Sequence, residues 1–174
     1  MTWIDIDGVL DNFKDTAKEF FGIELKHNVF GEWKWCSERC EYWSGCFQRQ
    51  GRSKRAYKYI CKCPTPTKFY NVVKMQPWAR ELISVVATTN TIQFITADYA
   101  KIKKKKIIDI FTMGHSVIEA PDKSVYCKCP ADLLIDDNPN ECERWRKKGG
   151  IAYWFNLAEE NPFENFLKWW RLGK

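Results

Sequence analysis

The hydrophobic and polar positions of the chain predict a series of strands and helices. An apolar stretch at residues 2–6 predicts a strand, and apolar side chains at helical spacing predict a helix over residues 12–21. After Pro77 the pattern becomes regular, and it predicts strands over residues 91–96, 116–119, 131–135 and 151–155 and helices over residues 79–87, 99–111, 140–148 and 162–171. Strands that alternate with helices in this way predict an α/β fold with a parallel sheet covered on both faces.

Three of these elements carry additional signals. The apolar run at residues 131–135 is continuous rather than alternating, which is typical of a strand buried on both faces. Gly149-Gly150 follows the helix at residues 140–148, where glycine can adopt the left-handed conformation that ends a helix. Pro162 stands at the start of the last helix, a position that proline favours.

The stretch between residues 27 and 67 differs from the rest of the chain. It shows no clean helical or strand period, and it holds five cysteines, several Trp and Tyr residues and a run of basic residues between Arg49 and Lys58. Pro64 and Pro66 mark its end. We therefore predict a core formed by residues 1–14 and 68–174, with a small cysteine-rich cap inserted at residues 15–67.

Composition and charge narrow the function only slightly. At 174 residues the chain is long enough for one domain with an insertion, and its net charge of +6 favours anionic partners without choosing among them. Asp5 and Asp7 interrupt the only candidate signal sequence, and no apolar run approaches the length of a membrane span. We expect a cytoplasmic protein that does not bind membranes. Its sequence is compatible with a homodimer.

Acidic residues follow two of the predicted strands. Asp5 and Asp7 come at the end of the first strand, Asp136 and Asp137 directly after the strand at 131–135, and Thr96 ends a third. The carboxyl ends of parallel strands lie at one edge of a sheet, where ligands bind. Carboxylates gathered there would repel each other unless a hard cation such as Mg²⁺ neutralised them.

Two other interpretations of these acidic residues are weaker. A calcium loop needs its glycine at the sixth position, whereas Gly8 stands fourth from Asp5. Asp136-Asp137 alone could cap a helix that begins near Pro139. Two acidic strand ends in one sheet outweigh both interpretations and favour a magnesium site.

Four short motifs resemble those of the haloacid dehalogenase superfamily. They are Ile4 to Leu10, Phe94-Ile95-Thr96-Ala97, Lys123, and Leu134-Ile135-Asp136-Asp137. Their order and spacing match throughout the chain outside the insertion. Within the superfamily, residues 7–13 and 122–139 are most similar to the 5'(3')-deoxyribonucleotidases, including many phage-encoded proteins. The resemblance implies a five-stranded parallel sheet with adjacent motif strands and, if the chain is phage-encoded, a location in the host cytoplasm.

The resemblance also implies a mechanism and assigns residues to it. Asp5 would be the nucleophile that forms an aspartyl-phosphate, and Asp7 would act as general acid and then as general base. Thr96 and Ala97 would contact the phosphate, and Lys123 would balance its charge in the transition state. Mg²⁺ would be bound by Asp5, by the Asp7 carbonyl and by Asp136 or Asp137, of which Asp137 is preferred. The substrate would be a small nucleotide, a (deoxy)nucleoside monophosphate.

The assignment of Lys123 has a rival. Extra residues around Cys127-Lys128-Cys129-Pro130 make Lys128 an alternative to Lys123, although Lys123 has the Asp-Lys-Ser context of the resemblance. Phe13 matches a position that contacts the base of the substrate in the relatives.

The lysine run at residues 101–106 favours a solvated helix face, but it could also bind a polyanion. Alternative functions are therefore a phosphatase of nucleic-acid ends, or a zinc-containing nucleic-acid-binding module on the same fold without turnover.

The cysteines suggest a second metal. Intracellular cysteines bind metals more often than they form disulfides, and the tetrapeptide Cys-Lys-Cys-Pro occurs at residues 61–64 and again at 127–130. A structural zinc in the cap is our hypothesis, and buried free thiols are the alternative. The zinc would take some four of the following residues: Cys36, Cys40, Cys46, Cys61, Cys63, Cys127 and Cys129.

Overall fold

The computed structural model describes residues 1–13, 15, 16, 19, 25–27, 33–35, 73–96 and 117–173. Several predictions from the sequence lie outside these residues. They are the helix over residues 99–111, most of the helix over 12–21, most of the cap at 15–67, residue Ala97 and the five cysteines of the cap.

A five-stranded sheet forms the centre of the molecule. Its strands are β1 (Thr2–Asp5), β4 (Ile92–Thr96), β5 (Val117–Glu119), β6 (Leu133–Asp136) and β7 (Ile151–Trp154). They lie in the order β5-β4-β1-β6-β7, and every neighbouring pair is parallel. The predicted five-stranded parallel sheet is therefore confirmed.

The register places the first strand between the two strands that carry the other motifs. Ile4 of β1 pairs with Phe94 of β4 on one side and with Ile135 of β6 on the other. Because the strands are parallel, Asp5, Thr96 and Asp136 end them at the same edge of the sheet.

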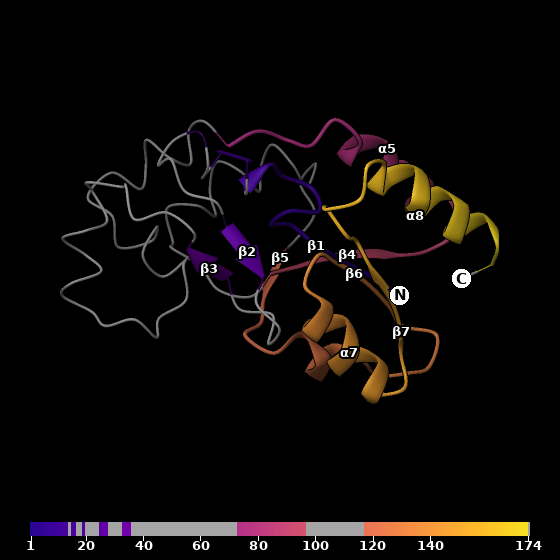
Figure 1. Cartoon of the computed structure of the whole chain (residues 1–174). Coiled ribbons are helices and arrows are strands. Elements are labelled where there is room, and N and C mark those ends of the chain that lie inside the picture. Colours follow the sequence, from indigo (N-terminus) through magenta and orange to yellow (C-terminus); the bar gives the residue numbers. More distant parts are fainter. Residues whose placement is uncertain are drawn as a thin grey trace, which may run out of the picture.

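Helices cover both faces of the sheet (Figure 1). Helices α5 (Ala79–Ala87) and α8 (Pro162–Arg171) lie on one face, and α7 (Pro139–Lys147) lies on the other. The hydrophobic core divides in the same way. Ile4, Phe94 and Ile135 pack with residues of α5 and α8, whereas Trp3, Ile95 and Leu134 pack with Trp145 of α7. This alternation follows from the two-residue period of a strand, which sends neighbouring side chains to opposite faces.

Three short elements complete the described structure, and the sequence pattern predicted none of them. Lys123–Tyr126 form a 3₁₀ helix, η1, between β5 and β6. Within the insertion, β2 (Leu25–His27) and β3 (Trp33–Trp35) pair as antiparallel strands of a separate sheet. The division into core and inserted cap stays a prediction.

Candidate active site

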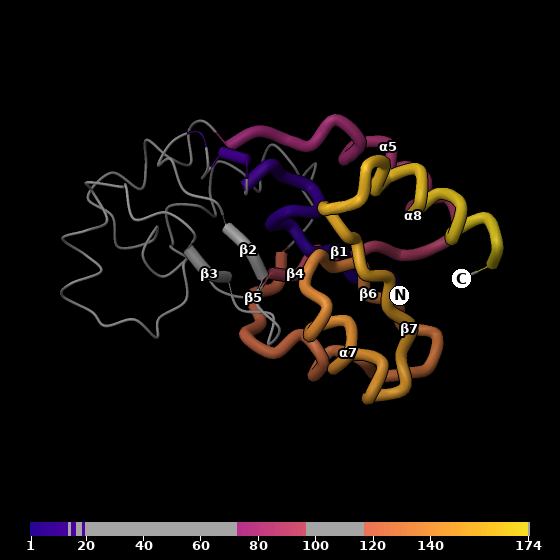
Figure 2. Tube along the Cα trace, viewed as in Figure 1, coloured from indigo at the N-terminus to yellow at the C-terminus, as the bar shows by residue number. Residues whose placement is uncertain are grey.

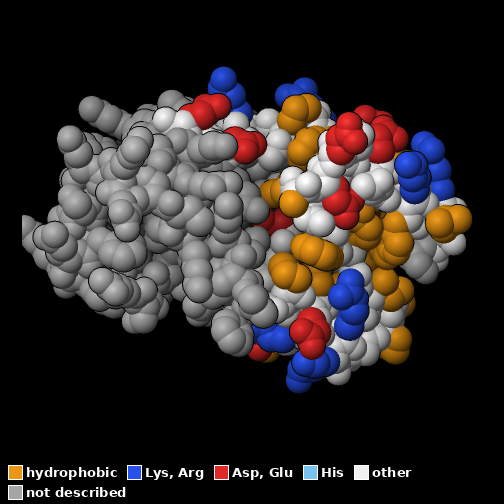
Figure 3. Space-filling model, viewed as in Figure 1, with side chains coloured by type: hydrophobic (Ala, Val, Ile, Leu, Met, Phe, Trp, Pro, Cys, Tyr) orange, Lys and Arg blue, Asp and Glu red, His pale blue; other side chains and the backbone are white. Residues whose placement is uncertain are grey.

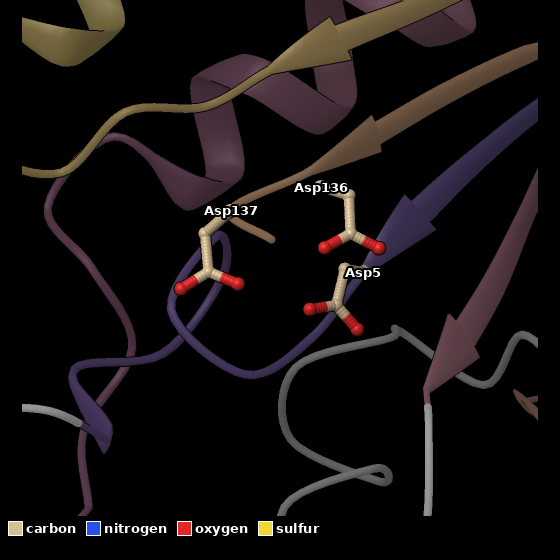
Figure 4. A group of neighbouring side chains, drawn as sticks. All are labelled: Asp5, Asp136 and Asp137. Carbon is tan, nitrogen blue, oxygen red and sulfur yellow. The ribbon is translucent and has the colours of Figure 1, made fainter. Parts of the chain in front are cut away.

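Three carboxylates meet at the carboxyl edge of the sheet (Figure 4). Asp5 ends β1, Asp136 ends β6, and Asp137 follows it directly. One oxygen from each lies within 4.8 Å of those of the other two. Their exposed fractions are 4%, 0% and 5%. Figure 4 shows the three side chains pointing in the same direction, with Asp137 to one side of Asp5 and Asp136.

Lys123 lies between two of these carboxylates. Its Nζ is 2.6 Å from Asp5 Oδ1 and 2.6 Å from Asp136 Oδ2, and its side chain is 2% exposed. The lysine is held by η1, which begins where Asp122 Oδ1 accepts hydrogen bonds from the backbone N and the Oγ of Ser124, at 3.0 and 2.7 Å. Asp136 is bound on both oxygens, since its Oδ1 accepts a hydrogen bond from the backbone N of Asn138 at 2.8 Å.

The charges of this cluster do not balance. Three carboxylates and one ammonium leave two negative charges when all four groups are ionised. Burial raises the pKa of Asp5 well above its usual value, and the neighbouring carboxylates add to this effect although Lys123 opposes it. Burial also raises the pKa of Asp136. Burial alone would lower the pKa of Lys123, but Asp136 and Asp5 outweigh it and raise the pKa above its usual value, so the lysine stays protonated.

This charge deficit fits a divalent cation. Magnesium binds through one or two carboxylates and completes its coordination with water and substrate phosphate. Asp5 and Asp137 supply two hard oxygen donors at one edge of the sheet, and one Mg²⁺ would neutralise the two remaining charges. The donor set therefore suits the magnesium that the sequence predicts.

Thr96 supplies an unsatisfied donor at the same edge. It ends β4, next to β1, and is fully buried, yet its Oγ1 has no hydrogen-bond partner among the residues that the structure describes. A buried hydroxyl without a partner costs free energy, and such groups in native proteins call for an explanation. A phosphate oxygen bound at the carboxyl edge would accept this hydrogen bond.

The loop after β1 depends on Gly8. This residue has φ +89°, a conformation that glycine adopts without strain. A Cβ at this position would lie 2.5 Å from Asp137 Oδ2 and 2.9 Å from its Cγ. Gly8 thus allows the loop that carries Asp7 to pass directly beside the Asp137 carboxylate.

The structure brings most of the predicted site residues together. Asp5, Asp136, Asp137 and Lys123 form one cluster, with Thr96 on the strand beside Asp5. The rival Lys128 is exposed in the loop before β6. Asp7 lies two residues beyond Asp5. Phe13 is buried in the core that α5 and α8 share, and its contact with a substrate base stays a prediction.

The predicted zinc site lies mostly outside the described residues. Cys127 and Cys129 are free thiols, and Cys129 is exposed. Cys142, which was not among the predicted zinc ligands, is buried, and its thiol donates to the carbonyl oxygens of Asp136 and Tyr153 at 3.6 and 3.5 Å. The cluster of Asp5, Asp136 and Asp137 is the only candidate metal site among the residues that the structure describes. The zinc hypothesis stays a prediction.

Sequence reasoning missed two buried carboxylates near the site. Glu141, in the first turn of α7, forms an ion pair with Arg144, and burial raises its pKa although Lys123 opposes the shift. In the sequence, its burial was indicated by its position four residues before Trp145, on the same face of α7. Asp11 lies at the base of the loop that carries Asp7 and is fully buried. Its position two residues before a predicted helical Phe13 is typical of a side chain that binds the backbone.

Comparisons with known proteins address the fold. No protein-family model and no curated protein matches the sequence. Among solved structures, the chain is similar to a haloacid dehalogenase-like family hydrolase from Streptococcus pneumoniae, at 11% identity and a TM-score of 0.57, over 99% of this chain and 97% of the other. The chain therefore has the haloacid dehalogenase-like fold.

Two further similarities are weaker. One is to a haloacid dehalogenase family enzyme from Bacteroides thetaiotaomicron in complex with magnesium and inorganic phosphate, at 12% identity and a TM-score of 0.49, over 91% of this chain and 95% of that one. The other is to a subfamily IA hydrolase of the same superfamily from Geobacter sulfurreducens, at 12% identity and a TM-score of 0.49, over 96% and 94% of the two chains.

Proposed function

We propose that the chain is a magnesium-dependent phosphomonoesterase that works through an aspartyl-phosphate on Asp5. The observation that carries this proposal is the buried cluster in which Lys123 bridges Asp5 and Asp136 while Asp137 lies beside them. In this cluster Asp5 is the nucleophile and the Lys123 ammonium is a cation held in place by two carboxylates. The cluster also has two negative charges without a counter-charge. These features suit the transfer of a phosphoryl group, for which positioning and electrostatic stabilisation supply most of the catalysis.

The first half-reaction uses Asp5 and Asp7. Asp5 Oδ1 is paired with Lys123, so Oδ2 is the oxygen that would attack phosphorus. As the new P–O bond forms, the bond between phosphorus and the leaving oxygen breaks, and Asp7 donates a proton to that oxygen. Lys123 and the Thr96 hydroxyl would stabilise the negative charge on the equatorial oxygens. Asp5, Asp137 and the Asp7 carbonyl would hold Mg²⁺, which would supply positive charge for the phosphate oxygens.

The second half-reaction restores the enzyme. Asp7, now a carboxylate, takes a proton from a water molecule, and the resulting hydroxide attacks phosphorus. The bond between phosphorus and Asp5 breaks, which releases inorganic phosphate and regenerates the Asp5 carboxylate. Asp7 thus serves as acid and then as base at the same position.

For the substrate we propose a (deoxy)nucleoside monophosphate, as for a 5'(3')-deoxyribonucleotidase. The support is the sequence resemblance of residues 7–13 and 122–139. On the face of the described part seen in Figure 3, basic and acidic side chains are interspersed.

Phosphate release from a panel of nucleoside monophosphates and of 3'- and 5'-phosphorylated oligonucleotides tests the proposal. It tests both the phosphomonoesterase activity and the choice of substrate. We expect release from mononucleotides with Mg²⁺, none with EDTA, and a loss of at least about a thousandfold in Asp5→Asn. A preference for oligonucleotides would make the protein an end-processing phosphatase. Oligonucleotide binding without release from any substrate would contradict the enzymatic proposal.

A further inference from the structure

Asp11 is a buried carboxylate that the proposed reaction does not use. Its side chain is 0% exposed, and its Oδ1 accepts two backbone hydrogen bonds, from Gly8 N at 3.1 Å and from Phe13 N at 3.2 Å. Hydrogen bonds from backbone N–H groups to a carboxylate are stronger than those between neutral groups. Asp11 therefore ties the peptide after Asp7 to the first turn of the following helical residues.

The bond to Gly8 fixes the direction of a neighbouring carbonyl. Gly8 N–H and the Asp7 carbonyl belong to one planar peptide group, and none of the described peptide bonds is cis. In a trans peptide the N–H and the C=O point in opposite directions. Because Gly8 N–H points at Asp11, the Asp7 carbonyl points away from Asp11.

Other contacts hold the far side of this loop. Asn12 N donates to Lys74 O at 2.9 Å, Gln76 N donates to Leu10 O at 2.8 Å, and Trp78 Nε1 donates to Val9 O at 3.0 Å. Figure 2 shows the segment that begins at residue 73 running beside the end of this loop. These three bonds fix residues 9–12, whereas Asp11 Oδ1 reaches the Asp7–Gly8 peptide.

Gly8 connects this peptide to the metal side of the site. A Cβ on Gly8 would lie 2.5 Å from Asp137 Oδ2, so the backbone at Gly8 runs directly beside that carboxylate. The Asp7–Gly8 peptide therefore lies next to one of the two carboxylates that would hold the ion.

We propose that Asp11 is a positioning residue for magnesium, which orients the Asp7–Gly8 peptide so that the Asp7 carbonyl faces the ion held by Asp5 and Asp137. The inference rests on the proposed function, in which the Asp7 carbonyl is a metal ligand. Asp11 itself contacts neither the metal nor the substrate. It acts through the Gly8 N–H, as residues outside a coordination sphere orient the ligands within it.

Two variants of Asp11 separate the orientation of the Asp7–Gly8 peptide from the charge of the Asp11 carboxylate. Asp11→Asn keeps an oxygen acceptor at Oδ1, whereas Asp11→Ala removes it. Magnesium affinity is measured by titration calorimetry, with Mn²⁺ as a paramagnetic probe, and phosphate release is measured at saturating Mg²⁺. We expect Asp11→Ala to weaken Mg²⁺ binding about 10- to 100-fold and Asp11→Asn to stay close to the unmodified protein.

A matched control separates this effect from a loss of stability. Val86→Ala removes two methyl groups from a fully buried residue of α5, a helix that contributes no residue to the site. It should lower the melting temperature and leave Mg²⁺ affinity unchanged. If Asp11→Ala lowers only the melting temperature, as this control does, the proposal is wrong. If Asp11→Ala does not fold, Asp11→Val, which also lacks an acceptor but fills more of the buried space, is measured in the same way.

The outcomes for the two proposals remain distinct. Unmodified protein that releases phosphate while Asp11→Ala retains full Mg²⁺ affinity would overturn only the role of Asp11. Unmodified protein that binds Mg²⁺ but hydrolyses no substrate would overturn the proposed function, and weaker binding by Asp11→Ala would still support its role. Unmodified protein that binds no Mg²⁺ would overturn both.

Discussion

Lys123 Nζ lies 2.6 Å from Asp136 Oδ2, and both side chains are buried. The same ammonium lies 2.6 Å from Asp5 Oδ1. One side chain from η1 thereby connects the ends of β1 and β6, which belong to distant parts of the sequence. The contact matters for stability as well as for the proposed reaction, because each of these charges is buried with the others.

Replacing Lys123 with Met should destabilise the protein strongly. Removing one member of a buried ion pair leaves its partners without a counter-charge, and such changes cost about 3–5 kcal/mol. Urea unfolding should show this loss in the metal-free protein and a smaller loss with Mg²⁺. The control is Lys147→Met, which removes an exposed pair with Glu143 and should have no measurable effect. Equal stability of the two variants would contradict the prediction.

Thr96→Val should separate stability from activity. The variant has nearly the same shape and removes a buried hydroxyl that lacks a partner, so we expect unchanged stability or a gain of about 1 kcal/mol. Phosphate release should fall about 10- to 100-fold because a hydrogen bond to the phosphate is lost. Thr96→Ser, which keeps the hydroxyl, should remain active. A valine variant with full activity would show that Thr96 does not bind the phosphate.

Gly8→Ala should damage both the fold and the metal site. Alanine at φ +89° is strained, at a cost of about 1–2 kcal/mol, and its Cβ would displace the Asp137 carboxylate. Thermal unfolding should report the strain and calorimetry the lower Mg²⁺ affinity. Gly149→Ala is a suitable control, since Gly149 has φ +91° but a Cβ there would meet no atom within 4 Å. It should therefore lose stability and keep its Mg²⁺ affinity.

Asp136 and Asp137 should respond differently to replacement by Asn. Both oxygens of Asp136 accept hydrogen bonds within the protein, one from Lys123 and one from Asn138 N. Asp136→Asn should therefore cost mainly stability. Asp137→Asn should weaken Mg²⁺ binding at least about tenfold if Asp137 is the direct ligand, because a carboxylate ligand binds the ion more strongly than an amide. Equal Mg²⁺ affinities of the two variants would argue against that assignment.

Asp132 should give the protein a dependence on pH in the acid range. The backbone N–H groups of Lys128 and Cys129 donate to its Oδ2 at 2.8 and 3.0 Å, and despite the opposing effect of burial the pKa of Asp132 lies below its ordinary value of 3.8. A carboxylate with a lowered pKa stabilises the folded state above that ordinary value, and its contribution disappears as the pH falls through the folded pKa.

Asp132→Ala should therefore lose about 1–2 kcal/mol at pH 7, and the difference from the unmodified protein should shrink below about pH 4. Urea unfolding at pH 7, 5 and 3 measures it. A difference that stays constant from pH 7 to pH 3 would mean that the charge of Asp132 does not contribute.

The sequence pattern predicted the core elements closely. The helices at residues 79–87 and 162–171 have the predicted bounds, because each combines an apolar stripe with a clear boundary signal. Gly149 ends α7 with φ +91°, as predicted. The buried strand predicted at residues 131–135 runs instead from Leu133 to Asp136. The shift brings Asp136 to the end of the strand itself.

Other features depend on contacts that no local pattern records. The 3₁₀ helix at Lys123–Tyr126 is fixed by the Asp122 side chain and has no hydrophobic period. Motif spacing left Lys123 and Lys128 as rivals, and only the fold brings one of them to Asp5. The roles of Asp11 and Asp132 were also missed, because both carboxylates bind backbone N–H groups of their own loops. Asp11 resembles an ordinary turn residue in the sequence, and Asp132 belonged to the strand predicted at residues 131–135.

The position of β1 has a consequence for synthesis of the protein. β1 leaves the ribosome before β4 and β6, yet it lies between these two strands in the sheet. During translation the apolar strand β1 therefore remains unpaired at both edges. This state is prone to aggregation and binds chaperones. Nascent chains that stop before β6 lack Asp136 and Asp137 altogether. Competence for the proposed reaction should accordingly appear only after β6 has been made, in a single step, rather than grow with chain length.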